Sequence, residues 1–334
     1  MSEKVISRTA EYQSCWISYT GSVAGALRPL SVDCDVVDVG GYSGYAFLVN
    51  VPVGNFCPSG PTAFHPSTWT EIRRGTEGLG CEVSHYSLGE GYPSIEGEPT
   101  PDDISRAKEL FQRVKSEVDG DRPVVIWGLP IPEYGIVNGY KGQSYVTSTY
   151  RRLINPGEPE EPVLYYELQS PGELHAIFFK APVERDAEEV HRKALERAVR
   201  FAMGKISVVE GYATGPSAFD EWAKVLESAH LDEVSYHGNS YVAACLHEAR
   251  EMASGFLGRL AESYQGTRSE SLRDVSQAYA ESAEALKGFT ELFPFSMAGE
   301  MPTEKRVKGA EILKRVKTME DGAIGYLKEV VESW

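Results

Sequence analysis

The spacing of apolar residues along this chain changes near residue 182. Before it, short apolar runs bounded by glycine and proline predict strands. Residues 122–127 form a near-continuous apolar run, which is typical of a strand buried on both faces. Residues 134–140 and 143–147 flank a Lys141-Gly142 turn and predict a hairpin. After residue 182, apolar residues recur at helical spacing, which predicts helices almost throughout.

The helix with the strongest sequence signals is expected at residues 100–118. Thr100 fits an N-cap, Pro101 the first helical position and Asp103 the third, which together form a capping box. One apolar stripe then runs along the helix, formed by Ile104, Ala107, Leu110, Phe111, Val114 and Val118. A helix that leads directly into a buried strand indicates a mixed layer of helices and strands.

Weaker patterns predict the other elements. In the first 182 residues they are a helix over 14–27 with Ser14 as N-cap, a helix from a Thr68 capping box to Gly78, and strands over 45–51, 81–87 and 174–179. The later helices are expected at 184–203, from an N-cap at Ser217, and near 239–264, 268–292 and 303–332. The sequence therefore predicts an α+β domain over 1–182 with a small, mainly antiparallel sheet, and an all-helical bundle domain over 183–334.

Composition excludes several classes of function. A net charge of −16 argues against binding to nucleic acid or to an anionic membrane surface, because both need a basic surface. Residues 1–14 lack the apolar core of a signal peptide, and the longest apolar run, 45–53, is too short to span a bilayer. Five cysteines without a CxxC pair do not support a zinc site, and a cytoplasmic location with reduced thiols is expected. The glycine-rich stretch at 40–54 lacks the GxGxxG pattern of a dinucleotide-binding site. The sequence thus supports neither a nucleotide site nor a metal site, and we expect no cofactor and no metal.

Cys15 is the sharpest candidate for chemistry. At the first turn of the expected helix, the helix dipole and unpaired backbone N–H groups would stabilise a thiolate, the form that acts as a nucleophile. The alternative is a small buried apolar side chain, the commoner fate of an intracellular cysteine.

The order of the N-terminal segments resembles a known superfamily. Cys15-Trp16 at a helix start is followed by RPVVIWG, then EYGIVNGYKGQSY, then ELHAIFFKA, over roughly residues 12–180. This order resembles the papain-like cysteine peptidases, and within them the family of the butirosin biosynthesis protein H N-terminal domain and the related double-glycine leader peptidases. The resemblance implies a papain-like fold for residues 1–182.

The resemblance also implies which residues would act. Its members pair the nucleophilic cysteine with a histidine at the start of the second core strand, and an Asp or Asn orients the imidazole. Cys15 matches the nucleophile, but the histidine position falls at Pro132-Glu133-Tyr134, where no histidine stands. Glu133 would serve as a base only if burial raised its pKa toward neutrality. Asn155 is a candidate for the third position.

Other side chains are candidates for the same site. His65, His85 and His175 could replace the missing imidazole, and His175 has the best case because its strand should neighbour the hairpin. A ligand pocket could be lined by Trp16, Tyr42, Tyr45, Phe64, His65, Tyr134 and Tyr140. Core packing is the alternative for the aromatic residues. Glu158, Glu160 and Glu161 fit a solvated acidic loop better than a glycosidase pair.

Two functions remain open from the sequence. The favoured one is a degenerate papain-like domain that binds a small molecule or peptide in a cleft between Cys15 and the bend at residues 130–134. The alternative is a cysteine-dependent acyltransferase, peptidase or amide hydrolase, with Cys15 as nucleophile and Glu133 or His175 as proton acceptor. The long C-terminal helices, with Ile312, Val316 and Leu327, could in addition pair between chains to form a homo-oligomer.

Overall fold

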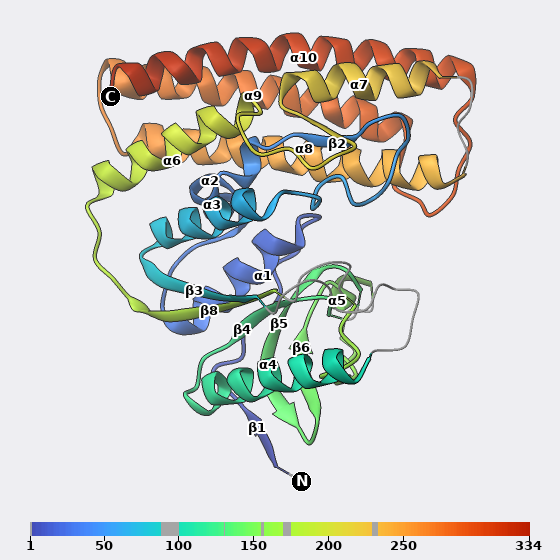
Figure 1. Ribbon diagram of the computed structural model, residues 1–334. Helices are drawn as coiled ribbons and strands as arrows, with labels where there is room; N and C mark the ends of the chain where they lie inside the picture. The colour runs from blue at the N-terminus through green and yellow to red at the C-terminus, as the bar shows by residue number, and fades with distance from the viewer. Residues whose placement is uncertain (1, 88–99, 130, 155–156, 170–174, 229–232) are drawn as a thin grey trace. The chain divides into compact units, whose positions relative to one another are not determined.

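The computed structural model describes residues 2–87, 100–129, 131–154, 157–169, 175–228 and 233–334 (Figure 1). Its contacts divide the chain into two compact units. The sheet unit comprises Met1–Val39 and Leu79–Glu184, and the helical unit comprises Gly40–Gly78 and Arg185–Trp334. The sequence prediction placed residues 40–78 with the strands. They belong to the helical unit because Val49, Val51 and Phe56 pack into a core with Trp222 and its helix.

The sheet unit contains a small antiparallel sheet in the strand order β3-β8-β4-β5-β6-β7, and β1 pairs with β5 beside it. This confirms the predicted mixture of helices with a small antiparallel sheet. The strands are β1 (Glu3–Val5), β3 (Cys81–Ser87), β4 (Val124–Trp127), β5 (Tyr134–Lys141), β6 (Ser144–Ser148), β7 (Val163–Leu164) and β8 (His175–Pro182).

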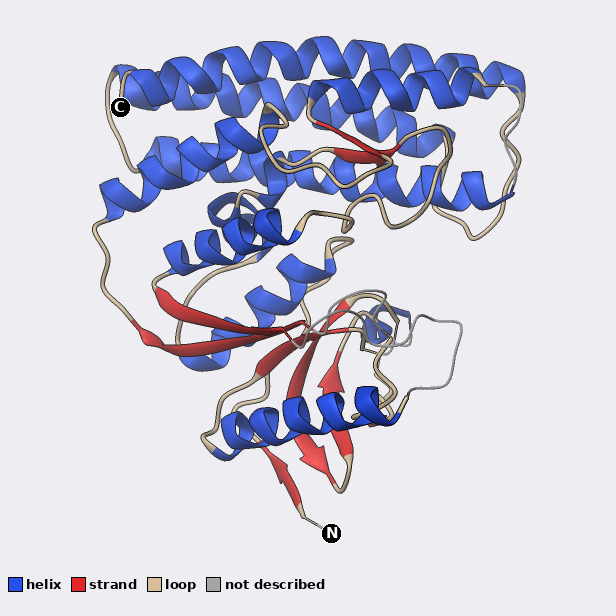
Figure 2. Cartoon of the chain, in the orientation of Figure 1, coloured by secondary structure: helices blue, strands red, loops and turns tan. Residues whose placement is uncertain are grey.

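Two helices cover opposite faces of this sheet, α1 (Ser18–Leu27) and α4 (Pro101–Asp119) (Figures 1 and 2). The α4 face carries Val124, Ile126 and Val137, which share a core with the predicted apolar stripe of α4. The α1 face carries the alternate residues, since Gly25 of α1 approaches the Ile136 side chain. The predicted α4 capping box is present, because the Thr100 and Asp103 side chains each accept from the other's backbone N–H.

Helix α1 begins later than the sequence predicted. Ile17 is its N-cap, so Ser14 does not cap it and Cys15 lies three residues before its first residue. The incoming chain folds back over the helix: Gln13 N donates to Gly21 O at 3.1 Å. The contact is so close that a Cβ on Gly25 would lie 2.1 Å from Glu11 O, which explains the small residues of this helix.

Three further element predictions were wrong in detail. Residues 45–51 form a 3₁₀ turn (Tyr45–Phe47) and a short strand β2 (Asn50–Pro52), because the carbonyls of Ala46 and Leu48 bind a buried arginine. Helix α3 (Pro66–Thr76) is capped by the His65 imidazole, which accepts from Ser67 N, and not by Thr68. Helix α7 (Pro216–Glu227) has Gly215 at its N-cap, and Ser217 lies inside it.

The helical unit confirms the predicted helical character of the C-terminal half. Besides α3 and α7 it holds α6 (Ala187–Ala202), α8 (Glu233–Glu262), α9 (Thr267–Leu292) and α10 (Thr303–Glu332), and β9 (Tyr212–Thr214) pairs with β2. Helices α8, α9, α10 and α7 pack in that order. The sheet unit also contains the short helix α5 (Arg151–Ile154) and the 3₁₀ turn Arg28–Leu30, whereas α2 (Val36–Ser43) and the 3₁₀ turn Glu77–Leu79 span the boundaries between the units in the sequence.

Side chains proposed for pairing between chains lie inside this unit. Val316 and Leu327 are fully buried, and Ile312 packs against the same core as Val316. They therefore contribute to the chain's own interior. Among the helices within the described ranges, none combines the length and apolarity needed to cross a bilayer.

The centre of the helical unit holds a buried ion pair. Arg250 donates to both carboxylate oxygens of Glu320, at 2.6 and 2.9 Å, and to the carbonyls of Ala46 and Leu48 at 2.7 and 3.2 Å. Ser282 also donates to Glu320. Arg250 thus connects residues 46–48 to helices α8 and α10, which lie some 200 residues or more later in the sequence.

Burial of His191 predicts a pH-dependent stability. Its Nδ1 lies 2.8 Å from the Tyr264 hydroxyl, and burial lowers the His191 pKa below its usual value of 6.5. At acidic pH, His191 therefore binds a proton more readily in the unfolded chain than in the folded one. The free energy of unfolding keeps its full value above about pH 6.5 and decreases as the pH falls through the lowered pKa of His191. Urea unfolding at neutral and mildly acidic pH should show His191→Gln losing less stability on acidification than the unmodified chain. An equal loss would contradict the assignment to His191.

Candidate functional site

Cys15 is folded back onto the first turn of α1. Its Sγ donates to Ile17 O at 3.1 Å and lies 3.4 Å from Thr20 Oγ1. The Thr20 hydroxyl donates to the same Ile17 carbonyl at 2.8 Å. Tyr12 closes the other side, since its hydroxyl donates to Cys15 O at 3.0 Å and lies 4.0 Å from Sγ. The thiol is half-buried, and it acts as a hydrogen-bond donor among polar neighbours.

Glu133 is joined to the start of α1 through Ser18. The Ser18 hydroxyl donates to Glu133 Oε2 and accepts from Tyr134 N at 3.0 Å. Ser18 is buried and Glu133 is half-buried. This contact joins the beginning of β5 to Ser18, three residues after Cys15. Pro130, which begins the predicted bend at 130–134, lies outside the described residues.

On the face of the sheet that α1 covers, residues with aromatic or imidazole side chains lie opposite one another on neighbouring strands. Trp127 pairs with Tyr134, and their rings meet at 4.9 Å. Tyr134 also meets Tyr19 of α1 at 5.4 Å. On β8, the register that pairs Ile126 with Ala176 places His175 opposite Trp127. His175 therefore shares this face, with the Trp127 strand between it and Tyr134.

Tyr150 lies in a turn two residues after Ser148, the last residue of β6, which pairs with Ile136 of β5. The Tyr150 hydroxyl is half-buried, and its pKa is raised, mainly by burial, with Arg151 lowering it and the negative charges of Glu133 and Glu160 raising it. Glu133 is thus close enough to act on this hydroxyl.

Two exposed apolar side chains flank the contact between Ser18 and Glu133. Trp16 and Ile131 are 41% and 38% exposed, and each lies two residues before one partner of the contact. Two residues of extended chain span about 7 Å, so both side chains arise near the contact. The neighbourhood combines a carboxylate, a thiol, tyrosine hydroxyl groups and apolar surface.

The structure separates the other predicted site residues from this cluster. Tyr140 lies at the far end of β5 from Tyr134, where its hydroxyl donates to Asp119. Tyr42, Tyr45, Phe64 and His65 belong to the helical unit. There Tyr45 packs on Phe64 and Trp69, Tyr42 packs on Phe256, and His65 caps α3. Core packing and helix capping account for these contacts.

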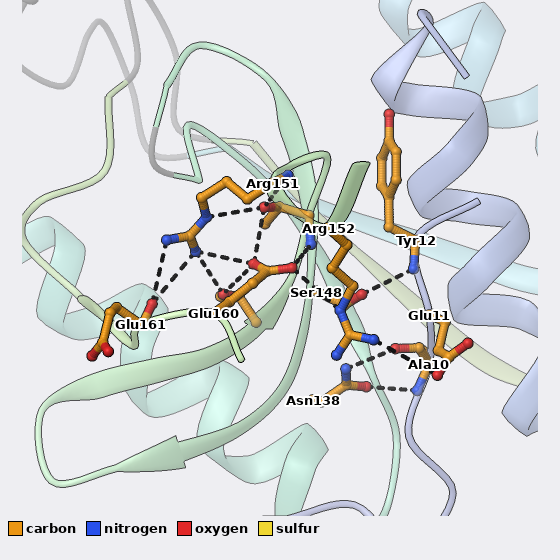
Figure 3. Close-up of polar contacts among 11 residues, drawn as sticks. Ala10, Glu11, Tyr12, Asn138, Ser148, Arg151, Arg152, Glu160 and Glu161 are labelled. Carbon is orange, nitrogen blue, oxygen red and sulfur yellow. Dashed lines mark hydrogen bonds and ion pairs between the residues drawn. The ribbon is translucent and has the colours of Figure 1, made fainter. Parts of the chain in front are cut away.

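Glu160 does not lie in a solvated acidic loop, which corrects the sequence prediction for this residue. Its side chain is 3% exposed and accepts from Thr149 N at 2.6 Å and from Arg151 at 3.0 Å. Arg152 lies 3.4 Å from the same carboxylate and 3.7 Å from Glu11 (Figure 3). Glu158 and Glu161 are exposed. Asn155, the candidate third residue, lies outside the described residues.

The segment that leads to Cys15 is held by the strands (Figure 3). Ala10 exchanges two hydrogen bonds of 2.8 Å with the buried Asn138 side chain, and Tyr12 N donates to Ser148 Oγ at 3.0 Å. Asn138 lies where the β5–β6 register shifts, so a bulge supplies this anchor. The position of Cys15 therefore depends on residues more than 120 positions away.

Sequence reasoning missed Ser18, Thr20, Tyr12 and Tyr150. The SxT spacing of Ser18 and Thr20 carries no catalytic signature, but two hydroxyl residues just after a candidate cysteine were a usable signal. Within the part of the chain that the structure describes, no group of three His, Cys, Asp or Glu side chains forms a candidate metal site. In comparisons with known proteins, no protein-family model matches the chain, and no curated protein has a similar sequence.

Proposed function

We propose that the sheet unit is a papain-like domain that binds a small molecule or peptide beside Cys15 and does not transfer acyl groups. The observation that carries the proposal is the protonated state that the contacts of Cys15 favour. Its sulfhydryl donates to the Ile17 carbonyl, and the neighbouring Thr20 hydroxyl donates to that same oxygen.

A nucleophilic cysteine must reach the thiolate form. A thiolate at this position would face the lone pairs of Ile17 O, 3.1 Å away, and would lose the hydrogen bond that the sulfhydryl makes. Glu133 stands at the position where the resemblance implies a histidine, and its carboxylate accepts a hydrogen bond from the Ser18 hydroxyl. The contact between Cys15 and the Ile17 carbonyl favours a neutral thiol over an activated one.

Two features support the papain-like assignment. The cysteine precedes a buried helix that packs on the sheet, and the residue before the second core strand touches the start of that helix through Ser18. Both match the arrangement that the resemblance implies. Trp16 and Ile131 supply exposed apolar surface next to this contact, which suits a ligand with an apolar group.

A cysteine-dependent acyl transfer is the second candidate function. It is favoured by the half-buried Cys15 thiol next to the N-terminal end of α1, where the helix dipole attracts negative charge. It would use Glu133 or His175 as proton acceptor. The two candidates predict different reactivity of Cys15.

Alkylation by iodoacetamide separates the two functions. From about pH 5 to about pH 9, we expect the Cys15 rate to rise with pH throughout, as for an ordinary thiol. Half-buried Cys57, in the helical unit, is the control measured in the same digest, while Cys34, Cys81 and Cys245 are buried. A fast Cys15 rate that is already constant near pH 6 would establish an activated thiolate and support acyl transfer.

Binding is tested in the same assay by protection. We expect 2-phenylethanol, a neutral aromatic probe, to slow alkylation of Cys15 and to leave that of Cys57 unchanged. Trp16→Ala should weaken this protection because it removes apolar surface beside the thiol. If no aromatic probe protects Cys15, the binding proposal is wrong.

A further inference from the structure

Arg73, in helix α3 of the helical unit, is a buried cation with little compensation for its charge. It is 6% exposed, and its Nε and Nη1 atoms are buried without a hydrogen-bond partner among the residues that the structure describes. Its Nη2 group donates to Thr70 Oγ1 at 3.5 Å, which is long for a hydrogen bond. Most of the five N–H donors of this guanidinium therefore have no acceptor within the described residues.

Arg250 of the same unit shows how a buried arginine is usually compensated. It donates to both carboxylate oxygens of Glu320 and to two backbone carbonyls. An arginine side chain keeps its proton in proteins, so a buried guanidinium stays charged and is costly without an acceptor. Arg73 thus lacks the counter-charge that Arg250 has.

The acidic side chains of α3 and of the turn that follows it pair with other arginines. Glu71 Oε2 lies 2.7 Å from an Arg200 nitrogen, and Glu77 Oε2 lies 3.8 Å from an Arg185 nitrogen. Within the described ranges of the chain, no carboxylate accepts from Arg73 Nε or Nη1. A bound molecule is therefore the expected source of the acceptor.

Thr70 marks the side of α3 from which such a molecule can reach Arg73. Around the helix axis, half-buried Thr70 lies between Arg73 and two exposed residues, Ser67 and Arg74. Side chains on a helix lean toward its N-terminus, so the Arg73 side chain extends over the turn that holds Thr70. A rotation of this long side chain toward Thr70 would bring the guanidinium to the surface of α3.

We propose that Arg73 is the binding residue of a second site, which takes the carboxylate or phosphate group of a small molecule. A guanidinium is planar and carries its donors in fixed directions, which match the oxygens of these two groups. The proposal does not depend on the function proposed for the sheet unit.

Isothermal titration calorimetry of the full chain with inorganic phosphate and with acetate tests the proposal, at an ionic strength held constant with sodium chloride. At least one of these oxyanions should bind, and Arg73→Met should weaken the binding at least about tenfold, because it removes a charge-assisted hydrogen bond. Arg74→Met removes the same charge from the exposed neighbouring position and should leave the affinity unchanged.

Arg73→Lys is a second variant, which keeps the positive charge and replaces the planar guanidinium by a single ammonium group. It should weaken oxyanion binding by a smaller factor than Arg73→Met does, because only the matched set of donors is lost. The unmodified chain and Arg74→Met should also unfold at a higher temperature as the oxyanion concentration rises. Two results would overturn the proposal: neither oxyanion binds the unmodified chain, or the binding is unchanged in both Arg73 variants.

Discussion

Arg250→Met is expected to lower the free energy of unfolding by about 3–5 kcal/mol, because it leaves the Glu320 carboxylate buried without its cation. Both side chains are fully buried, and the guanidinium binds the two carboxylate oxygens. The substitution also removes the donors to Ala46 O and Leu48 O. Urea denaturation followed by circular dichroism measures the loss.

Two further variants show how much of that loss of stability comes from the unpaired Glu320 carboxylate. Combining Arg250→Met with Glu320→Leu should recover much of the stability, because replacing a whole buried pair by apolar groups is often nearly neutral. Lys314→Met, which breaks the exposed pair with Glu227, should change the stability by at most about 1 kcal/mol. A double variant as unstable as Arg250→Met alone would show that the bonds to Ala46 and Leu48 dominate.

Gly25→Ala is expected to destabilise the sheet unit by about 3 kcal/mol or more, since overpacking against backbone admits little relaxation. The added Cβ would lie 2.1 Å from Glu11 O and 2.8 Å from the Ile136 side chain. Relief requires that the segment before Cys15 move away from α1. Thermal unfolding gives the size of the effect, and faster alkylation of Cys15 should accompany it.

Gly322→Ala is the matched control. Gly322 lies within α10, and a Cβ there would meet nothing within 4 Å. Alanine is a better helix former than glycine, so this variant should gain about 0.5–1 kcal/mol. If Gly25→Ala were as stable as Gly322→Ala, the close approach of residue 11 to α1 would be wrong.

The sequence correctly predicted the elements whose signals lie within their own residues. The apolar run that forms β4 is buried on both faces, as its composition predicted. The α4 capping box and apolar stripe are signals contained within the helix itself, and both are present. The hairpin of β5 and β6 likewise follows from its own turn.

Long-range contacts decided what the sequence could not predict. The start of α1 is set by residues 10–13, which fold back over the helix and are anchored by Asn138 at Ala10 and by Ser148 at Tyr12. Glu160 is buried because Thr149, Arg151 and Arg152 converge on it, which no acidic run reveals. At the site, the bend and the cysteine were predicted to meet, but their connection through Ser18 depends on the fold.

The interleaved order of the two units has a consequence for biosynthesis. Residues 40–78 leave the ribosome early, yet their buried partners, such as Arg250, follow about 200 residues later. At about 5–20 residues per second, this segment waits about 10–40 s for the helices that cover it. During that interval Val49, Val51 and Phe56 are apolar groups without their core, so the nascent chain should be a client for chaperones that shield such surfaces.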